Sequence, residues 1–169
     1  HRLQDVRLTD SALNEAFAAS ARVAGDVNGD GFSDLIVGAP KWNLTGAAYL
    51  FHGFTYHQAD WVLDGTVPGA LLGSSVWTAG DVNHDHYSDI IAGAPAGTDS
   101  GNPGRAQIYH GSAGAPPHTP ARTLTANRAN DQFGKSVSTA RDVNGDTYAD
   151  VLIGAPDRSS GQFHEGAAY

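Results

Sequence analysis

Short apolar runs, each closed by glycine and proline, recur three times along the chain. They read Leu-Ile-Val-Gly-Ala-Pro at 35–40, Ile-Ile-Ala-Gly-Ala-Pro at 90–95 and Val-Leu-Ile-Gly-Ala-Pro at 151–156. Runs of this length, bounded by turn residues, are typical of buried strands. Because leucine, isoleucine and valine come in such bursts rather than at helical spacing, the pattern predicts an all-β chain with many turns.

Each apolar run belongs to a longer repeat with fixed internal spacing. Twelve residues before every Gly-Ala-Pro begins a polar loop, at Asp26, Asp81 and Asp142, which gives periods of 55 and 61 residues. Nine residues earlier stands a large apolar residue, at Phe17, Leu72 and Phe133. Two more apolar segments complete the unit, at 46–53, 104–111 and 166–169, and then at 61–64 and 122–125. Four short antiparallel strands that repeat radially describe the blade of a β-propeller.

The repeats predict a single propeller segment, 1–169, with three blades' worth of strands. We expect repeats at about 17–65, 72–126 and 133–169, with 7–10 as a displaced outer strand, since Leu8 stands nine residues before Phe17. The first strand of each repeat is rich in small residues and is expected innermost, where blades crowd around the axis. The second strand carries apolar core residues, and the third packs aromatic and aliphatic side chains between blades.

Oxygen-bearing side chains stand at positions 1, 3, 5 and 9 of each polar loop. Such oxygens repel one another unless a cation lies between them, and Ca2+ takes about six to eight oxygen ligands. The backbone carbonyl of position 7 adds a further ligand. The predicted calcium ligands are Asp26, Asn28, Asp30, Phe32 and Asp34; Asp81, Asn83, Asp85, Tyr87 and Asp89; and Asp142, Asn144, Asp146, Tyr148 and Asp150.

Two other interpretations of the loops are weaker. Asp, Asn and Gly also form ordinary turns, but three copies in one register make that interpretation the minor one. An EF-hand needs flanking helices and a bidentate glutamate at position 12, where this chain has Val37, Ala92 and Ile153. Up to three Ca2+ ions are therefore the expected cofactor.

Charge and composition agree with bound cations and argue against nucleic acid. Nine of the 18 acidic residues lie in the three loops, so three Ca2+ ions would take the formal charge from −8 to −2. The ten Lys and Arg residues are scattered, whereas nucleic-acid binders gather them on one face. No apolar run is long enough to span a membrane. Weak multi-carboxylate loops fill at the calcium level outside cells, which predicts an extracellular or secreted protein.

Catalytic motifs are missing from the sequence. Gly-x-Ser-x-Gly and His-Glu-x-x-His are absent, and Gly134-Lys135-Ser136 lacks the earlier glycine of a phosphate-binding loop. The eight histidines are scattered or recur at repeat positions, which favours structural roles over zinc binding. We expect no enzyme activity. A ligand would bind loops opposite the calcium loops, with Trp42 and Arg158 as exposed anchors.

The chain resembles FG-GAP repeats, the blades of the β-propeller in integrin alpha chains and in many secreted bacterial proteins. Phe133-Gly134, the three Gly-Ala-Pro motifs and the three Asp-rich loops carry the resemblance, which covers nearly the whole chain. It implies that the loop between the first two strands of each blade binds Ca2+. The chain departs from the pattern at Ala18 and at position 6 of the loops, where His86 and Thr147 replace glycine. A positive φ costs threonine the most free energy because its side chain is β-branched. We therefore expect the third site, which contains Thr147, to bind Ca2+ the most weakly.

Three blades alone should not close a ring, because propellers have about four to eight blades and open sheet edges aggregate. Two assemblies stay open: part of a larger propeller, or a homodimer that closes six blades, each copy lending its first strand. We expect a calcium-binding, non-catalytic module for extracellular adhesion or recognition, with a protein or glycan ligand. The alternatives are an accessory or catalytic propeller domain of a secreted glycan- or lipid-active enzyme, and an excised or designed propeller fragment.

Overall fold

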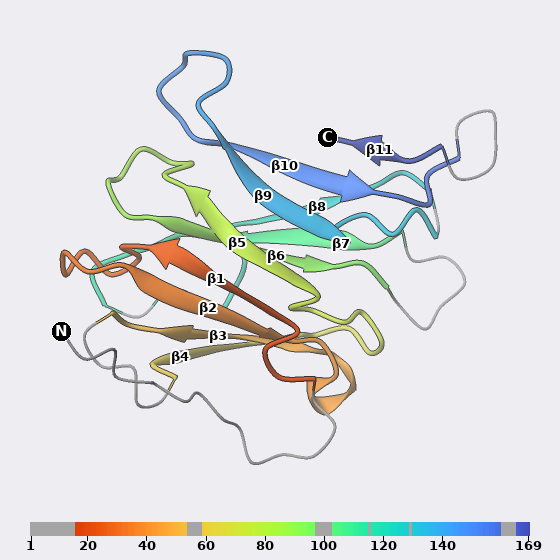
Figure 1. The fold of residues 1–169 in the computed structure, drawn as a ribbon, viewed down its shortest axis with the longest axis horizontal. Helices are drawn as coiled ribbons and strands as arrows, with labels where there is room; N and C mark the ends of the chain where they lie inside the picture. The colour runs from red at the N-terminus through yellow and green to blue at the C-terminus, as the bar shows by residue number, and fades with distance from the viewer. Residues whose placement is uncertain (1–15, 54–58, 97–102, 115, 129, 160–164) are drawn as a thin grey trace, which may run out of the picture.

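The computed structural model describes residues 16–53, 59–96, 103–114, 116–128, 130–159 and 165–169. Within these ranges the chain forms three antiparallel sheets that follow one another in space (Figure 1). One short 3-10 turn, η1 (Trp42–Leu44), is the helical element of the described residues. The described part of the chain contains no helix with the length and apolar character that crossing a membrane requires.

The first two sheets contain four strands each, and the third contains three in the described residues. Their orders are β1-β2-β3-β4, β5-β6-β7-β8 and β11-β10-β9. The strands are β1 (Ser20–Gly25), β2 (Asp34–Ala39), β3 (Ala47–Phe51), β4 (Trp61–Asp64), β5 (Ser75–Gly80), β6 (Asp89–Ala94), β7 (Arg105–Tyr109), β8 (Arg122–Thr125), β9 (Ser136–Arg141), β10 (Asp150–Ala155) and β11 (Ala167–Ala168).

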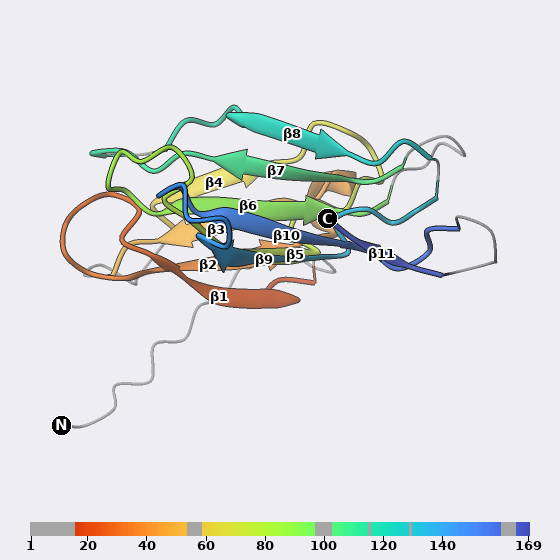
Figure 2. The ribbon, with the colours of Figure 1, turned by 90° about the horizontal axis from the view of Figure 1, so that it is seen from above.

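The first strand of each sheet lies against the first strand of the next, β1 against β5 and β5 against β9 (Figures 1 and 2). Serine side chains connect these strands. The hydroxyl of Ser20 accepts a hydrogen bond from the amide of Val76 at 3.2 Å, and that of Ser75 accepts one from Val137 at 3.1 Å. Small residues such as these serines let the strands approach, as predicted for the innermost strand of a blade, and larger side chains meet beside them where Arg22 lies over the ring of Trp77 at 4.8 Å.

Glycines of the Gly-Ala-Pro motif meet the neighbouring blade at its closest approach. A methyl group on Gly38 would overlap the carbonyl oxygen of Gly73 in the second blade, and one on Gly93 would overlap the carbonyl oxygen of Gly134 in the third. The recurring glycines therefore permit backbone to pack on backbone, and a side chain at these positions would separate the blades.

Two apolar cores fill the spaces between successive blades. The first joins Ile36 and Leu50 of the first sheet to Ile90 and Tyr109 of the second. The second core joins Ile91 and Ile108 to Phe133 and Ile153, among others. The prediction that third-strand side chains pack between blades is confirmed for Ile108 and Tyr109, which are both buried. It does not hold for Tyr49 and Phe51, whose cluster contains residues of the first blade alone. A third cluster, with Tyr49 and Phe51, covers the other face of the first sheet.

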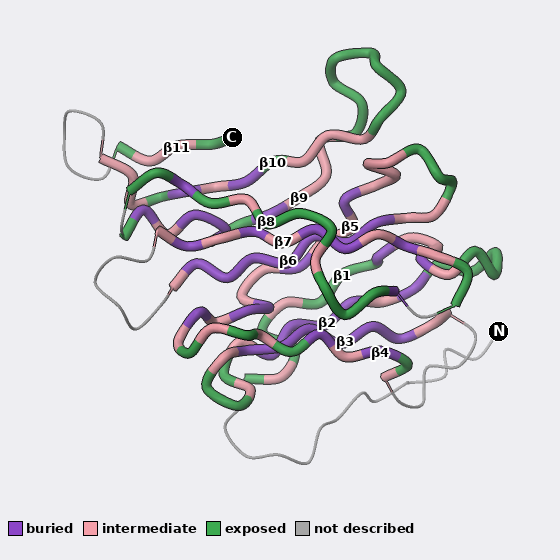
Figure 3. Tube along the Cα trace, turned by 180° about the vertical axis from the view of Figure 1, so that it is seen from behind, coloured by how far each residue is buried: buried purple, intermediate pink, exposed green. Residues whose placement is uncertain are grey.

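The predicted fold class is confirmed: the described chain is an all-β array of propeller blades. The displaced outer strand predicted at 7–10 lies outside the described residues. The predicted limits of the repeats stay a prediction. The third sheet is the least buried, and Figure 3 shows that the loop between β9 and β10 is the most exposed of the three Asp-rich loops.

Candidate metal centres

The three Asp-rich loops are the tips of hairpins that join the first and second strands of each sheet, as the sequence predicted. The aspartate at position 1 holds each loop closed. In the first loop, Oδ1 of Asp26 accepts the amides of Gly29 at 2.7 Å and Asp30 at 3.1 Å, and Oδ2 accepts the amide of Gly31 at 2.9 Å. The third loop repeats this set around Asp142. Each loop therefore winds around a carboxylate.

Positions 3 and 5 are linked in the same way in all three loops. In the first loop the side-chain amide of Asn28 donates to Oδ2 of Asp30 at 3.0 Å, and Oδ1 of Asp30 accepts the amide of Phe32 at 2.8 Å. The corresponding bonds recur in the second and third loops. The oxygens of positions 1, 3 and 5 are thus kept on one short turn of backbone.

In the first two loops the aspartate at position 9 is buried, unlike the aspartates at positions 1 and 5. Asp34 and Asp89 are both 0% exposed, and each accepts two backbone amides. Asp89 takes those of Val82 at 2.8 Å and Gly111 at 2.8 Å, so it connects the loop to the end of the third strand. Asp34 makes the equivalent pair of bonds with Val27 and Gly53.

The pKa values of these carboxyl groups follow their surroundings. Burial raises the pKa of Asp34 and Asp89, although the two backbone amides on each work in the opposite direction. At the exposed tips, the Asn28 side chain and the Phe32 amide lower the pKa of Asp30, and the Thr147 amide leads the groups that lower the pKa of Asp142. The carboxylates of Asp30 and Asp142 are therefore held in the charged form that a cation would bind.

The donor chemistry of each loop fits a hard cation: side-chain oxygens at positions 1, 3, 5 and 9, and the carbonyl of position 7. All five positions lie within nine residues of one turn. However, the described residues contain no group of three or more His, Cys, Asp or Glu side chains gathered closely enough to hold a metal. The carboxylates are instead satisfied by loop amides, and binding a cation would require them to turn toward one another.

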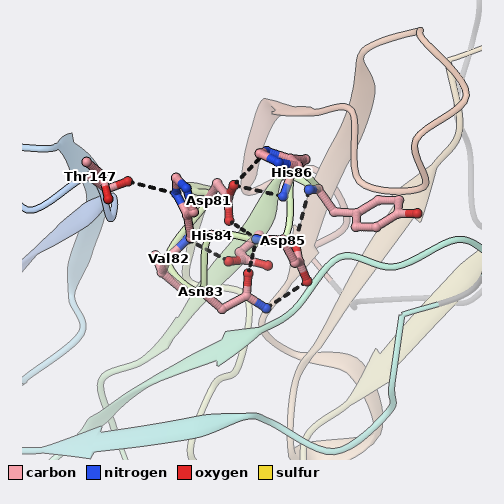
Figure 4. A network of polar contacts seen from close by, with 9 residues as sticks. Asp81, Val82, Asn83, His84, Asp85, His86 and Thr147 are labelled. Carbon is pink, nitrogen blue, oxygen red and sulfur yellow. Dashed lines mark hydrogen bonds and ion pairs between the residues drawn. The ribbon is translucent and has the colours of Figure 1, made fainter.

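Neighbouring loops touch in a repeated manner that the sequence did not reveal. The amide of position 8 donates to the carbonyl of position 1 in the preceding loop, Ser88 to Asp26 and Ala149 to Asp81, both at 2.9 Å. In the second loop, Nδ1 of His84 lies 3.2 Å from the carbonyl oxygen of Thr147 in the third (Figure 4). These contacts depend on how blades stack, so spacing along one repeat gives no sign of them.

Position 6 has a positive φ in every loop: 86° at Gly31, 74° at His86 and 77° at Thr147. A β-branched residue is strained in this region. We therefore predict that Thr147→Gly raises the free energy of unfolding by about 1 kcal/mol in urea titrations, after allowance for the greater freedom of glycine in the unfolded chain. Gly31→Thr is the matched control and should lower the free energy of unfolding. Equal free energies of unfolding for both variants and the parent protein would contradict the assignment of strain.

The two residues predicted as exposed ligand anchors are instead engaged within the chain, so that prediction is wrong. Trp42 is half-buried and packs edge-on against Tyr49, with ring centroids 6.0 Å apart. Arg158 lies 3.8 Å from Asp131 and stacks on the ring of Tyr169 at 5.7 Å. Both side chains pack against a tyrosine of their own blade, and the sequence does not show that proximity.

Successive antiparallel blades, each with an Asp-rich loop between its first two strands, define a β-propeller segment. The family profile of the FG-GAP repeat matches residues 17–51, 73–109 and 133–169. Among curated proteins, integrin alpha-7 of Rattus norvegicus is 36% identical over 162 residues, covering 90% of this chain and 14% of that protein. Integrin alpha-PS5 of Drosophila melanogaster is 35% identical over 157 residues, covering 85% of this chain and 15% of that protein.

The chain belongs to the FG-GAP repeat family. This confirms the resemblance inferred from the Gly-Ala-Pro motifs and Asp-rich loops. The chain spans about one seventh of the length of the integrin alpha chains that it matches.

Proposed function

We propose that the three hairpin loops bind Ca2+ and that the ions stabilise the blades. The observation that carries this proposal is the threefold recurrence of the same oxygen donors on the same wound turn, around Asp26, Asp81 and Asp142. A bound cation would offset the repulsion among the three or four acidic and amide oxygens of each tip. It would also join the tip to the buried aspartate at position 9, and through it to the third strand.

Calcium removal should lower the thermal stability strongly. A site at about one hundred times its dissociation constant contributes about 2.7 kcal/mol, and a chain of this size gains about 2–4 °C per kcal/mol. We therefore expect the midpoint in millimolar Ca2+ to exceed that in EDTA by more than about 10 °C. Mg2+ at the same concentration is the control for ionic strength. An unchanged midpoint would contradict the proposal.

We further propose that the module is non-catalytic and acts outside the cell in adhesion or recognition. Support comes from the integrin alpha chains among its relatives and from the absence of a catalytic sequence motif. Loops that bind Ca2+ only weakly would still be occupied at the calcium concentration outside the cell. A recognition role is tested by binding of the calcium-loaded protein to arrays of extracellular proteins and glycans, with the EDTA-treated protein as the control.

We also propose that the three blades complete a larger ring, either with a second copy or with further blades. The outward face of the third blade supports this proposal. Val143 and Leu152 are 72% and 47% exposed, whereas their equivalents in the first blade, Val27 and Ile36, are fully covered by the second blade. Light scattering tests the homodimer by measuring the molar mass in solution. Twice the mass of the chain would support the homodimer, and a folded protein with the mass of one chain would contradict it.

A further inference from the structure

Two backbone peptide units connect each Asp-rich loop to the next one along the chain. The carbonyl of Tyr87, a predicted Ca2+ ligand of the second loop, and the amide of Ser88 belong to the same peptide unit. That amide donates to the carbonyl oxygen of Asp26 in the first loop at 2.9 Å. The unit is trans, so it is planar and its N–H and C=O point in opposite directions. The hydrogen bond to the first loop therefore fixes the direction of a ligand in the second loop.

The second peptide unit continues the connection back to a buried carboxylate. The carbonyl of Asp26 shares its peptide unit with the amide of Val27, which donates to Oδ2 of Asp34 at 2.8 Å. This bond turns the Asp26 carbonyl away from Asp34 and toward the second blade. Asp34 is 0% exposed and also accepts the amide of Gly53 at 2.9 Å, which holds its side chain in place. We call the two peptide units and the carboxylate that ends them a relay.

The same relay connects the second loop to the third. Oδ2 of Asp89 accepts the amide of Val82 at 2.8 Å, and the carbonyl of Asp81 in that peptide unit accepts the amide of Ala149 at 2.9 Å. The Ala149 amide shares its peptide unit with the carbonyl of Tyr148, the predicted position 7 ligand of the third loop. Two copies with the same groups in the same order show that the relay recurs with the stacking of the blades.

Side-chain contacts hold the same ligand residues against the preceding loop. The ring of Tyr87 lies against Gly29, at position 4 of the first loop, where an added methyl group would come within 2.6 Å of Cε1. At the next interface the ring of Tyr148 lies beside that of His84, also at position 4, with centroids 5.6 Å apart. Each position 7 residue is therefore held by the preceding loop through its side chain as well as through the peptide unit that follows it.

We propose that Asp34 and Asp89 are positioning residues for the calcium site of the next loop, in addition to being ligands of their own. Through the relay, Asp34 sets the orientation of the Tyr87 carbonyl, and Asp89 sets that of the Tyr148 carbonyl. Groups that orient a metal ligand in this way typically change metal affinity by about 10–100-fold. The inference rests on the proposed calcium binding, because the direction of a carbonyl matters to affinity only where a cation uses it.

Site-resolved calcium titration by NMR tests this dependence on the full chain. The position 6 amides of Gly31, His86 and Thr147 each donate to the carboxylate at position 1 of their own loop, so each reports one site. The titrant is CaCl2, with a chelator to set the free concentration. In Asp34→Ala, we expect the affinity reported by His86 to fall about tenfold and that reported by Thr147 to stay as in the parent protein. Unchanged affinity at His86 would overturn the proposal.

Two further variants separate the relay from other causes. Tyr49→Ala destabilises the first blade from a cluster that contains residues of that blade alone, and it should not change the affinity reported by His86. Asp30→Ala removes an oxygen from the tip of the first loop but leaves both peptide units in place, so it should weaken the site reported by Gly31 and not the next one. If either variant weakened the His86 site as much as Asp34→Ala does, lost stability or the lost first cation would explain the effect and overturn the proposal.

Hydrogen exchange on the unaltered chain tests the relay without any variant. A cation on the carbonyl of Tyr87 draws electron density from the peptide unit and makes the Ser88 amide a stronger donor to Asp26. Calcium should therefore slow the exchange of Ser88 and, one loop later, of Ala149. Calcium binding reported by His86 with unchanged exchange at both amides would overturn the proposal alone. A parent chain that binds no calcium would overturn the proposed function and this inference together.

Discussion

Asp89→Ala is expected to lower the free energy of unfolding by about 3–5 kcal/mol, even in EDTA. The substitution leaves the amides of Val82 and Gly111 without their acceptor inside the protein, and each buried donor to a charged group is worth about 1.5–3 kcal/mol. Urea unfolding at neutral pH measures the effect. Asp89→Asn keeps the shape but accepts only one of the two amides, so we expect about half the loss.

The third blade supplies a matched control for this prediction. Asp150 occupies the same repeat position, but it is partly exposed, and among the described residues its carboxylate accepts the amide of Val143 alone. Asp150→Ala should therefore cost about 1 kcal/mol in EDTA. If Asp89→Ala and Asp150→Ala cost the same, the amide pair does not hold the second blade together and the explanation fails.

Gly93→Ala is expected to cost about 3 kcal/mol or more. The added methyl group would overlap the carbonyl oxygen of Gly134, which is backbone and cannot rotate aside, so the second and third blades must move apart. Gly154 is the control from the same motif, because a methyl group there meets the hydroxyl of Ser136, a side chain free to turn. Gly154→Ala should cost less than about 1 kcal/mol. Equal losses in thermal or urea unfolding would show that blade contact is not the cause.

The fold was largely predictable because each repeat contains the residues that mark its own turns and strand ends. Asp-rich tips, apolar runs and Gly-Ala-Pro appear at fixed spacing, and the structure places each tip between the first two strands of a blade. The innermost position of the first strand followed from its small residues. Local chemistry decides these features, so a single repeat contains the information and three copies reinforce it.

Contacts between blades were harder to predict than the blades themselves. Spacing along the chain did not reveal that the amides of Ser88 and Ala149 donate to the preceding loop. It also gave no sign that His84 reaches the third loop. Such contacts depend on the angle and distance between stacked sheets, which spacing along the chain does not specify. The prediction for Trp42 was wrong for a different reason, because its contact with Tyr49 lies within one blade but joins residues that are not neighbours in the sequence.

Calorimetric titration of the chelated protein with CaCl2 tests the central claim most directly, since it counts bound ions. Three occupied loops predict a stoichiometry of three per chain. Asp26→Asn, Asp81→Asn and Asp142→Asn should each reduce it by one while the protein stays folded. A titration that releases no heat, with full retention of structure in EDTA, would contradict the account, as would a stoichiometry that these substitutions leave unchanged.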